Sequence, residues 1–242
     1  LLHILASEGS IDLNEQIVNY KPFKNFSDNL IFKNIIVLDL LTHQSGIDNP
    51  YLSFRLAYSG DYTQEEILRL IEEETKKNEG GKTFEYTNFG YYLLDYLLQA
   101  ELGKSWKELL NEKVFQPLEM INTTASISEI PIEKLALPHS GVIQGEVKKA
   151  SLLKSNEVMH AAGGLVSSIE DAGKLLTFYL DKGKDIYTKE MVEDTYQTQV
   201  AAKDSFIRLF EGTGYASGWR TGIFEKEQVV YHFFSIYILP LI

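Results

Sequence analysis

Residues 84–99 read FEYTNFGYYLLDYLLQ, and this stretch decides the fold of the chain. It opens with a short polar turn and continues as a segment whose apolar residues spread over a wide helical face, which is typical of a helix packed in a protein core. Gly103 lies just past its end, where glycine commonly terminates a helix. The sequence therefore predicts a buried helix that begins near Asn88.

Helical signals continue on both sides of this segment. Residues 63–66 (T-x-x-E) and 105–108 (S-x-x-E) are capping boxes that precede apolar runs, and a further helix is expected from Ser168 to about Leu180. Strand-like segments rich in aromatic and β-branched residues appear only late, at 215–221, 228–232 and 236–239. We expect an α+β fold, with a helical region over 63–196 packed on a short, incomplete antiparallel sheet that has an exposed edge.

The composition indicates a globular protein without nucleic-acid partners. The 242 residues are 44% apolar, enough to bury a core, and 34 acidic against 23 basic residues give a net charge of −11. This charge repels phosphate backbones and anionic lipid. No cysteine is present, so disulfides, thiolate metal sites and cysteine nucleophiles are excluded.

The chain shows no division into domains. No repeat, low-complexity tract or long Gly/Ser/Pro-rich linker interrupts it, which predicts one domain over 1–242. Its longest apolar stretches, around 30–41 and 231–242, are shorter than the ~20 residues of a membrane-spanning helix. Residues 1–6 already read as the interior of a helix, so we expect residues to be missing upstream, where a secretion signal could have stood.

Three literal matches to hydrolase signatures fail on context. Residues 27–29 (SDN) spell a β-lactamase motif but lie close behind the first helix, where we expect them to start a turn. Residues 151–154 (SLLK) spell S-x-x-K but stand downstream of the other motifs. Residues 43–47 (HQSGI) look like a nucleophile elbow, yet G-x-S-x-G requires glycine where His43 and Ile47 stand. None of these serines is assigned as a nucleophile.

Four other segments occur in an informative order: 5–13 (LASEGSIDL), 40–47 (LLTHQSGI), 84–91 (FEYTNFGY) and 162–168 (AGGLVSS), the last running into Asp171. Together they resemble the class C β-lactamase-related family, which includes penicillin-binding carboxypeptidases, D-aminopeptidases and esterases. The resemblance spans nearly the whole chain. It implies a β-lactamase/transpeptidase-like fold, with the first segment at the end of the helix that carries the nucleophile.

Tyr86 and Asn88 match the family's Y-x-N, which implies that the Tyr86 phenol carries protons and that the Asn88 amide grips the substrate. A tyrosine with a free pKa of ~10 serves as a base near neutrality only if cations hold its phenolate. In the family that cation is the lysine of S-x-x-K, and we expect both this lysine and the nucleophilic serine to be absent from the chain. The alternative is that Tyr86 packs a helix start capped by Thr87 or Asn88.

A third motif, K-T-G or H-x-G on a strand, should line the opposite wall of the site. Residues 220–222 (RTG) have the right spelling, but they follow Gly218-Trp219, which resembles the family's strand ahead of the motif. His232 follows the next strand, where the family's histidine is expected, although Phe233-Phe234 replaces the glycines. We favour His232 and leave Arg220 open.

The glycine pair Gly163-Gly164 lacks the lysine and the spacing of a nucleotide-binding loop and is expected to let the chain pass close under the wall that binds substrate. His43 has no second histidine or acid at ligand spacing, so we expect it to be hydrogen-bonded inside a turn. No metal and no cofactor are expected. Tyr86 and Asn88 should converge with the glycine loop on one concavity, opposite the third motif.

These motifs lead to two hypotheses about function. The first is a serine hydrolase that forms an acyl-enzyme on β-lactams, D-amino-acid peptides or esters, of which this chain is an inactive part. The second is a non-catalytic binding protein, a degenerate penicillin-binding-protein relative that has kept the cleft. The resemblance favours a periplasmic, cell-envelope or secreted location, and it leaves the substrate open.

Overall fold

The computed structural model describes residues 1–26, 32–47, 49–58, 62–74, 82–137, 139–140, 148–149, 154–183, 185–203 and 211–232. Its α-helices are α1 (Leu2–Ser7), α2 (Val37–Leu41), α3 (Pro50–Tyr58), α4 (Gln64–Glu74), α5 (Phe89–Leu102), α6 (Trp106–Leu110), α7 (Ile169–Leu180) and α8 (Lys189–Tyr196). Its strands are β1 (His139–Ser140), β2 (Lys148–Lys149), β3 (Val200–Ala201), β4 (Glu211–Tyr215), β5 (Arg220–Phe224) and β6 (Glu227–Tyr231). The expected α+β class is confirmed.

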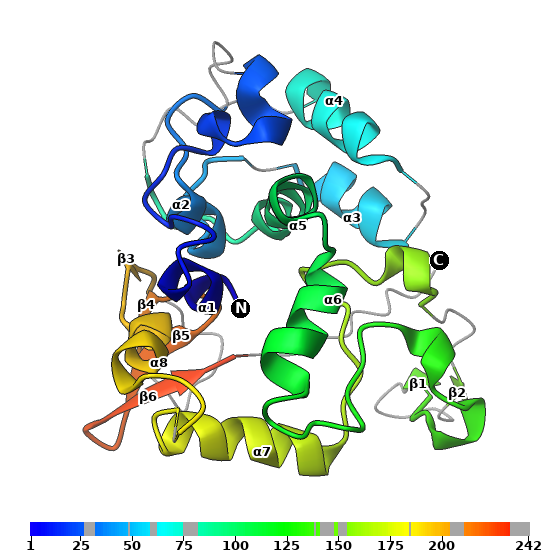
Figure 1. Cartoon of the computed structure of the whole chain (residues 1–242), viewed down its shortest axis with the longest axis vertical. Helices are drawn as coiled ribbons and strands as arrows, with labels where there is room; N and C mark the ends of the chain where they lie inside the picture. The colour runs from blue at the N-terminus through cyan, green and yellow to red at the C-terminus, as the bar shows by residue number, and fades with distance from the viewer. Residues whose placement is uncertain are drawn as a thin grey trace.

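Helix α5 is the buried helix that residues 84–99 predict, and it lies in the middle of the helical body (Figure 1). Leu93, Leu94, Leu97 and Leu98 face the main hydrophobic core and are at most 2% exposed. Gly90 lets α2 approach, because a Cβ there would overlap the Leu40 carbonyl. The helix ends at Gly103, whose φ of 66° is left-handed as expected.

Capping explains where the neighbouring helices begin. Before α4, the Glu66 amide donates to Thr63 Oγ1 at 3.2 Å while the Glu66 carboxylate accepts from the Thr63 amide at 2.8 Å. Ser105 and Glu108 form the same reciprocal pair at the start of α6. The predicted capping boxes are therefore confirmed.

Helix α7 is tied to the distant loop at Asn122 and Thr123 through one buried carboxylate. Ser168 caps the helix by accepting from the Asp171 amide at 3.1 Å. Asp171 is fully buried, and its Oδ2 accepts from the Asn122 amide at 2.7 Å and from Thr123 Oγ1 at 2.9 Å. The segment that carries Gly163-Gly164 is thus anchored at its C-terminal end.

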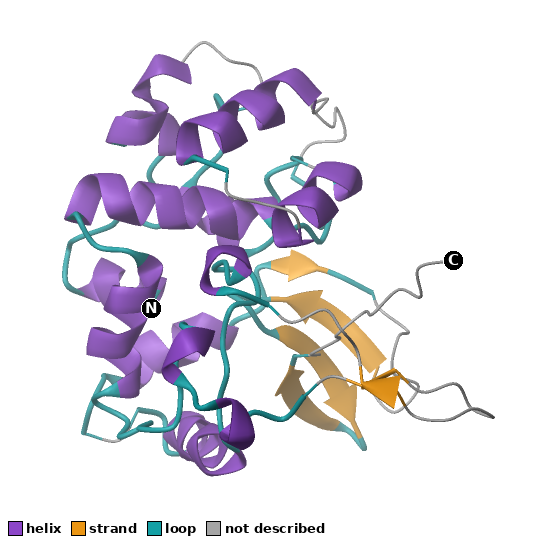
Figure 2. Ribbon diagram, turned by 90° about the vertical axis from the view of Figure 1, so that its right-hand side faces the viewer, coloured by secondary structure: helices purple, strands orange, loops and turns teal. Residues whose placement is uncertain are grey.

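Strands β3 to β6 form one antiparallel sheet in that order, and Figure 2 shows the helices on one side of it. The expected single strand over 215–221 is wrong. Gly218, with φ 90°, turns the chain, and the Ala216 amide donates to the Trp219 carbonyl at 2.7 Å. Tyr215 therefore ends β4 and Arg220 begins β5, side by side in the hairpin.

The sheet joins the helical body through α1 and α8, which pack against each other. His3 of α1 lies 2.9 Å from Ser217 Oγ in the β4–β5 turn. In the described part of the chain β6 pairs with β5 alone, which fits the expected outer edge. Residues 236–239, predicted as a strand, lie outside the described residues, and no helix that is described is long and apolar enough to span a bilayer.

Candidate active site

Tyr86 lies in the short segment directly before α5. His43 of the 40–47 motif holds the residues on both sides of it. The Glu85 amide donates to the His43 carbonyl at 2.8 Å, and the Thr87 amide donates to His43 Nδ1 at 3.3 Å. The Tyr86 ring lies 4.2 Å from the His43 imidazole, tilted by 36°. Its side chain remains 46% exposed, so the phenol is accessible from one side.

Arg220 approaches Tyr86 from the sheet. Its guanidinium lies 6.0 Å from the centre of the Tyr86 ring, 5.8 Å from Phe84 and 5.9 Å from Tyr215, distances at which a cation is attracted to an aromatic face. The short turn at Gly218 is what brings the first residue of β5 to this position. Tyr86 and Arg220 therefore meet, although 134 positions separate them in the sequence.

The charge state of Tyr86 follows from two opposing effects. Burial raises the pKa of the phenol, and the positive charge of Arg220 works against this shift without cancelling it. The net pKa lies above the ordinary value for tyrosine. Tyr86 is therefore a protonated phenol at neutral pH in this chain.

Asn88 is the N-cap residue directly before α5, where its carbonyl accepts from the Tyr91 and Tyr92 amides. Its side chain makes no capping hydrogen bond. The Phe89 amide instead meets Thr87 Oγ1 at 3.3 Å, so Thr87 supplies the capping contact. The Asn88 amide is left available beside the Tyr86 segment.

His232 and Arg220 lie close to each other at one end of the sheet, so the structure does not separate them as alternatives in space. Arg220 pairs with Tyr231 across the β5–β6 ladder, and His232 is the next residue. Burial lowers the pKa of His232, the Arg220 charge lowers it further, and a hydrogen bond with the Gly218 backbone opposes both effects. Phe233-Phe234 lies outside the described residues.

Gly163 and Gly164 occupy a tight turn with different constraints. A Cβ on Gly164 would lie 2.7 Å from the His160 carbonyl oxygen, whereas a Cβ on Gly163 would meet nothing within 4 Å. The turn contacts α5 because the His160 ring packs 4.5 Å from the Tyr92 ring. The contacts among described residues thus join the turn to α5 rather than directly to Tyr86. Lys154 Nζ donates to the Gly163 carbonyl at 3.2 Å.

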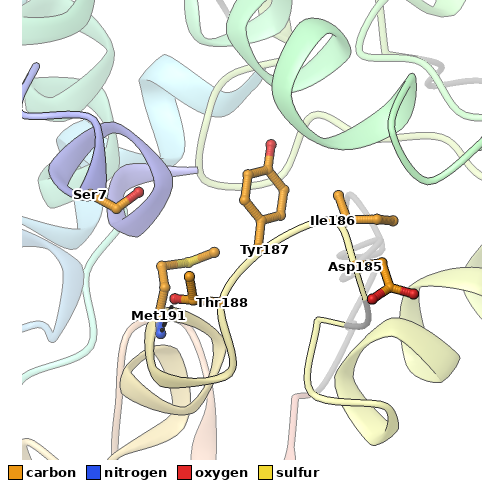
Figure 3. A pocket seen from close by; sticks show the side chains of 6 residues that line it. All are labelled: Ser7, Asp185, Ile186, Tyr187, Thr188 and Met191. Atoms are coloured by element: carbon orange, nitrogen blue, oxygen red, sulfur yellow. Dashed lines mark hydrogen bonds between the residues drawn. The ribbon is translucent and has the colours of Figure 1, made fainter.

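A separate cavity of about 370 Å³ lies away from these residues (Figure 3). It is lined by Ser7, Asp185, Ile186, Tyr187, Thr188 and Met191. The Ser7 hydroxyl donates to the Ile4 carbonyl at 2.7 Å and the Tyr187 hydroxyl to the Lys113 carbonyl at 2.5 Å. Its hydroxyl groups are therefore engaged in the fold, and we assign it no chemistry.

The short sequence matches add no second site. Ser45 Oγ accepts from the Ile47 amide at 3.3 Å, as a turn residue does, and Gly46 has φ 70°. Residues 27–29 and Ser151 lie outside the described residues. No group of three or more acidic or histidine side chains suited to a metal occurs among the residues that are described.

Sequence reasoning missed the side chains that support Tyr86 from behind. Tyr215, 1% exposed, meets His43 Nε2 at 3.1 Å, and Tyr91 donates to the Leu41 carbonyl at 3.2 Å. His43 was expected to bond within its own turn, but its ring bonds to residues 44 and 172 positions away. The signal available in the sequence was the place of His43 in the ordered 40–47 motif.

The helical body, the antiparallel sheet and the Tyr86 segment between them define the β-lactamase/transpeptidase-like class of fold. The sequence profile of the Beta-lactamase family matches residues 1–232, and the chain belongs to this family.

Three proteins illustrate what the chain is similar to. Unguisins hydrolase ungD' of Aspergillus campestris is 24% identical over 209 residues, which cover 82% of this chain and 38% of that protein. D-amino acid amidase of Ochrobactrum anthropi has a TM-score of 0.76 at 24% identity, covering 96% of this chain and 64% of that one. The octameric penicillin-binding protein homologue of Pyrococcus abyssi has a TM-score of 0.75 at 26% identity, covering 95% and 52%. The chain spans less than two thirds of the length of each.

Proposed function

We propose that the full-length protein is a serine hydrolase that cleaves amide, lactam or ester bonds through an acyl-enzyme. The observation that carries this proposal is the place of Tyr86: its phenol is half-exposed, packed on a buried His43 and faced by the Arg220 guanidinium. A tyrosine held in this way by a cation and by fixed backbone is suited to proton transfer.

Each residue has a role in this proposal. The serine of an S-x-x-K segment outside this chain attacks the carbonyl, and its lysine, together with Tyr86, moves the proton to the leaving group. The Asn88 amide holds the substrate. Its side chain makes no helix-capping hydrogen bond and can therefore serve this role. His232 and Arg220 form the opposite wall, and the Gly163-Gly164 turn lets the chain pass close under the wall that binds substrate. Water then releases the acyl group.

The family resemblance and the relatives support small molecules or short peptides as substrates. Their names include a D-amino acid amidase and an unguisins hydrolase. For this protein we propose a β-lactam, a D-amino-acid peptide or a small ester, handled in the periplasm, in the cell envelope or outside the cell.

The test uses the full-length protein with a chromogenic cephalosporin, a nitrophenyl ester and a D-amino-acid nitroanilide. Tyr86→Phe should lower kcat by ~10²–10⁴-fold, the usual contribution of a positioned acid or base. Tyr51→Phe is the matched control, since Tyr51 is 89% exposed on α3. Full activity of Tyr86→Phe on every substrate would remove Tyr86 from the mechanism.

A non-catalytic binding protein is the second candidate. One observation favours it: burial keeps the Tyr86 phenol protonated, and only Arg220 offsets this effect in the described residues. The two candidates separate in the same assays, because a binding protein retains affinity for a β-lactam or peptide in calorimetry while showing no turnover in the full-length form.

A further inference from the structure

His43 contacts the backbone on both sides of Tyr86. The Glu85 amide bonds to its carbonyl oxygen and the Thr87 amide to its ring nitrogen Nδ1, at 2.8 and 3.3 Å. The ring itself lies 4.2 Å from the Tyr86 ring. His43 therefore holds the backbone of residues 85–87 in place and packs against the ring of Tyr86.

The direction of the hydrogen bonds is set by the Thr87 amide, which can only donate. His43 Nδ1 must then be an acceptor, so the single ring proton of neutral His43 is on Nε2 and is donated to the Tyr215 hydroxyl, 3.1 Å away. His43 is 2% exposed, and burial lowers its pKa to about 3, so the ring stays neutral at working pH.

Two tyrosine hydroxyls lie behind the phenol. The Tyr215 hydroxyl accepts from His43 Nε2, and the Tyr91 hydroxyl donates to the Leu41 carbonyl, two residues before His43, at 3.2 Å. The centres of the Tyr215 and Tyr91 rings lie 4.8 and 5.6 Å from the His43 ring. Because β4 contributes Tyr215 and α5 contributes Tyr91, these contacts connect both elements to the 40–47 motif beside the phenol.

We propose that His43 is a positioning residue for Tyr86, which sets the place of the phenol through the Thr87 contact, the Glu85 contact and ring packing. The proposal rests on the function proposed for Tyr86. Two further features restrict the position: His43 has φ 57°, and its side chain must accept a hydrogen bond at the δ atom. Asparagine tolerates this φ and can place its acceptor oxygen at the δ position, whereas both polar atoms of glutamine, acceptor and donor, lie one bond further out at the ε position.

The experiment compares His43→Asn, His43→Gln and Tyr215→Phe in the full-length protein. We expect His43→Gln to lower kcat by ~10²-fold with KM nearly unchanged, since a misplacement of about 1 Å has this effect. His43→Asn should retain kcat within about tenfold of the wild type, and Tyr215→Phe should fall between the two. Denaturant unfolding corrects each rate for the folded fraction.

A second readout separates positioning from stability. The ¹³Cζ resonance of labelled Tyr86, followed through a pH titration, should shift in His43→Gln and stay close to the wild type in His43→Asn. Equal kcat values and an unmoved Tyr86 resonance in folded His43→Gln would overturn the proposal. The resonance can be measured without turnover, so it tests the His43 proposal by itself. A fully active Tyr86→Phe variant would instead refute the function proposed for Tyr86.

Discussion

Asp171 should be the most costly single polar residue to remove from the wall that carries the glycine turn. Its buried carboxylate accepts two short bonds, from the Asn122 amide at 2.7 Å and Thr123 Oγ1 at 2.9 Å, and lies 3.2 Å from Lys174 Nζ. Hydrogen bonds to a charged group contribute ~1.5–3 kcal/mol each. Asp171→Ala removes both, so the free energy of unfolding should fall by about 3–6 kcal/mol.

Asp171→Asn gives the graded comparison. Its amide oxygen can still accept from Asn122 and Thr123, but the charge is lost and its NH₂ group faces the Lys174 ammonium, so we expect a loss of ~1–2 kcal/mol. Glu170→Ala is the matched control, because Glu170 is an exposed acid in the same first turn of α7 and should cost only the ~0.3–1 kcal/mol of a helix-terminus charge.

The pH dependence of unfolding tests the charge itself. Burial works to raise the pKa of Asp171, but the bonds from Asn122, Thr123 and Lys174 outweigh it and hold the pKa below its ordinary value. The stabilisation is therefore present above the ordinary aspartate pKa of ~3.9 and is lost as the pH falls through the lower folded pKa. The difference between wild type and Asp171→Asn in urea unfolding should shrink in that range. If Asp171→Ala costs no more than Glu170→Ala at pH 7, the reasoning about this carboxylate is refuted.

Three further predictions concern the turn, the histidines and the isolated chain. Gly164→Ala should lower the free energy of unfolding by ~1–3 kcal/mol, because the added Cβ would lie 2.7 Å from the His160 oxygen. Gly163→Ala should be close to neutral, since a Cβ there meets nothing within 4 Å. Equal melting temperatures for the two variants would contradict this prediction. Burial lowers the pKa values of His43 and His160 to about 3, below the ordinary value of ~6.5. The free energy of unfolding should therefore decrease as the pH falls from ~6.5 to about 3, by up to ~1.4 kcal/mol per pH unit for each histidine. A urea midpoint that does not change over this range would contradict the prediction. The 242-residue chain, assayed alone, should not hydrolyse a chromogenic cephalosporin or a nitrophenyl ester; turnover that survives Tyr86→Phe in this chain would place the chemistry elsewhere.

Much of the helical body could be predicted from the sequence because its signals are local. The apolar face of α5, the glycine after it and the capping boxes at 63–66 and 105–108 act within one or two helical turns, and all are present as expected. The order of the four motifs identified the family for the same reason, since each motif is a short contiguous segment.

The sheet side of the site was less predictable. Residues 215–221 have the composition of one strand, but the left-handed Gly218 splits them into the end of β4 and the start of β5. A single glycine in an aromatic run does not reveal whether the chain bends there. The sequence alone therefore leaves Arg220 and His232 as alternatives, although the β5–β6 ladder pairs Arg220 with Tyr231, the residue directly before His232.

The sequence by itself determined the family, the fold class and the Tyr86–Asn88 motif, because these depend on residue types at short and regular spacings. Only the tertiary structure decided what surrounds Tyr86: His43 bonded on both sides of it, Tyr215 behind it and Arg220 in front. These partners come from segments separated by 44 to 172 positions, and their meeting depends on how α5, the 40–47 motif and the β4–β5 hairpin pack. Hydrogen bonds act over about 3 Å, so no pattern along the chain specifies them until packing has brought the segments together.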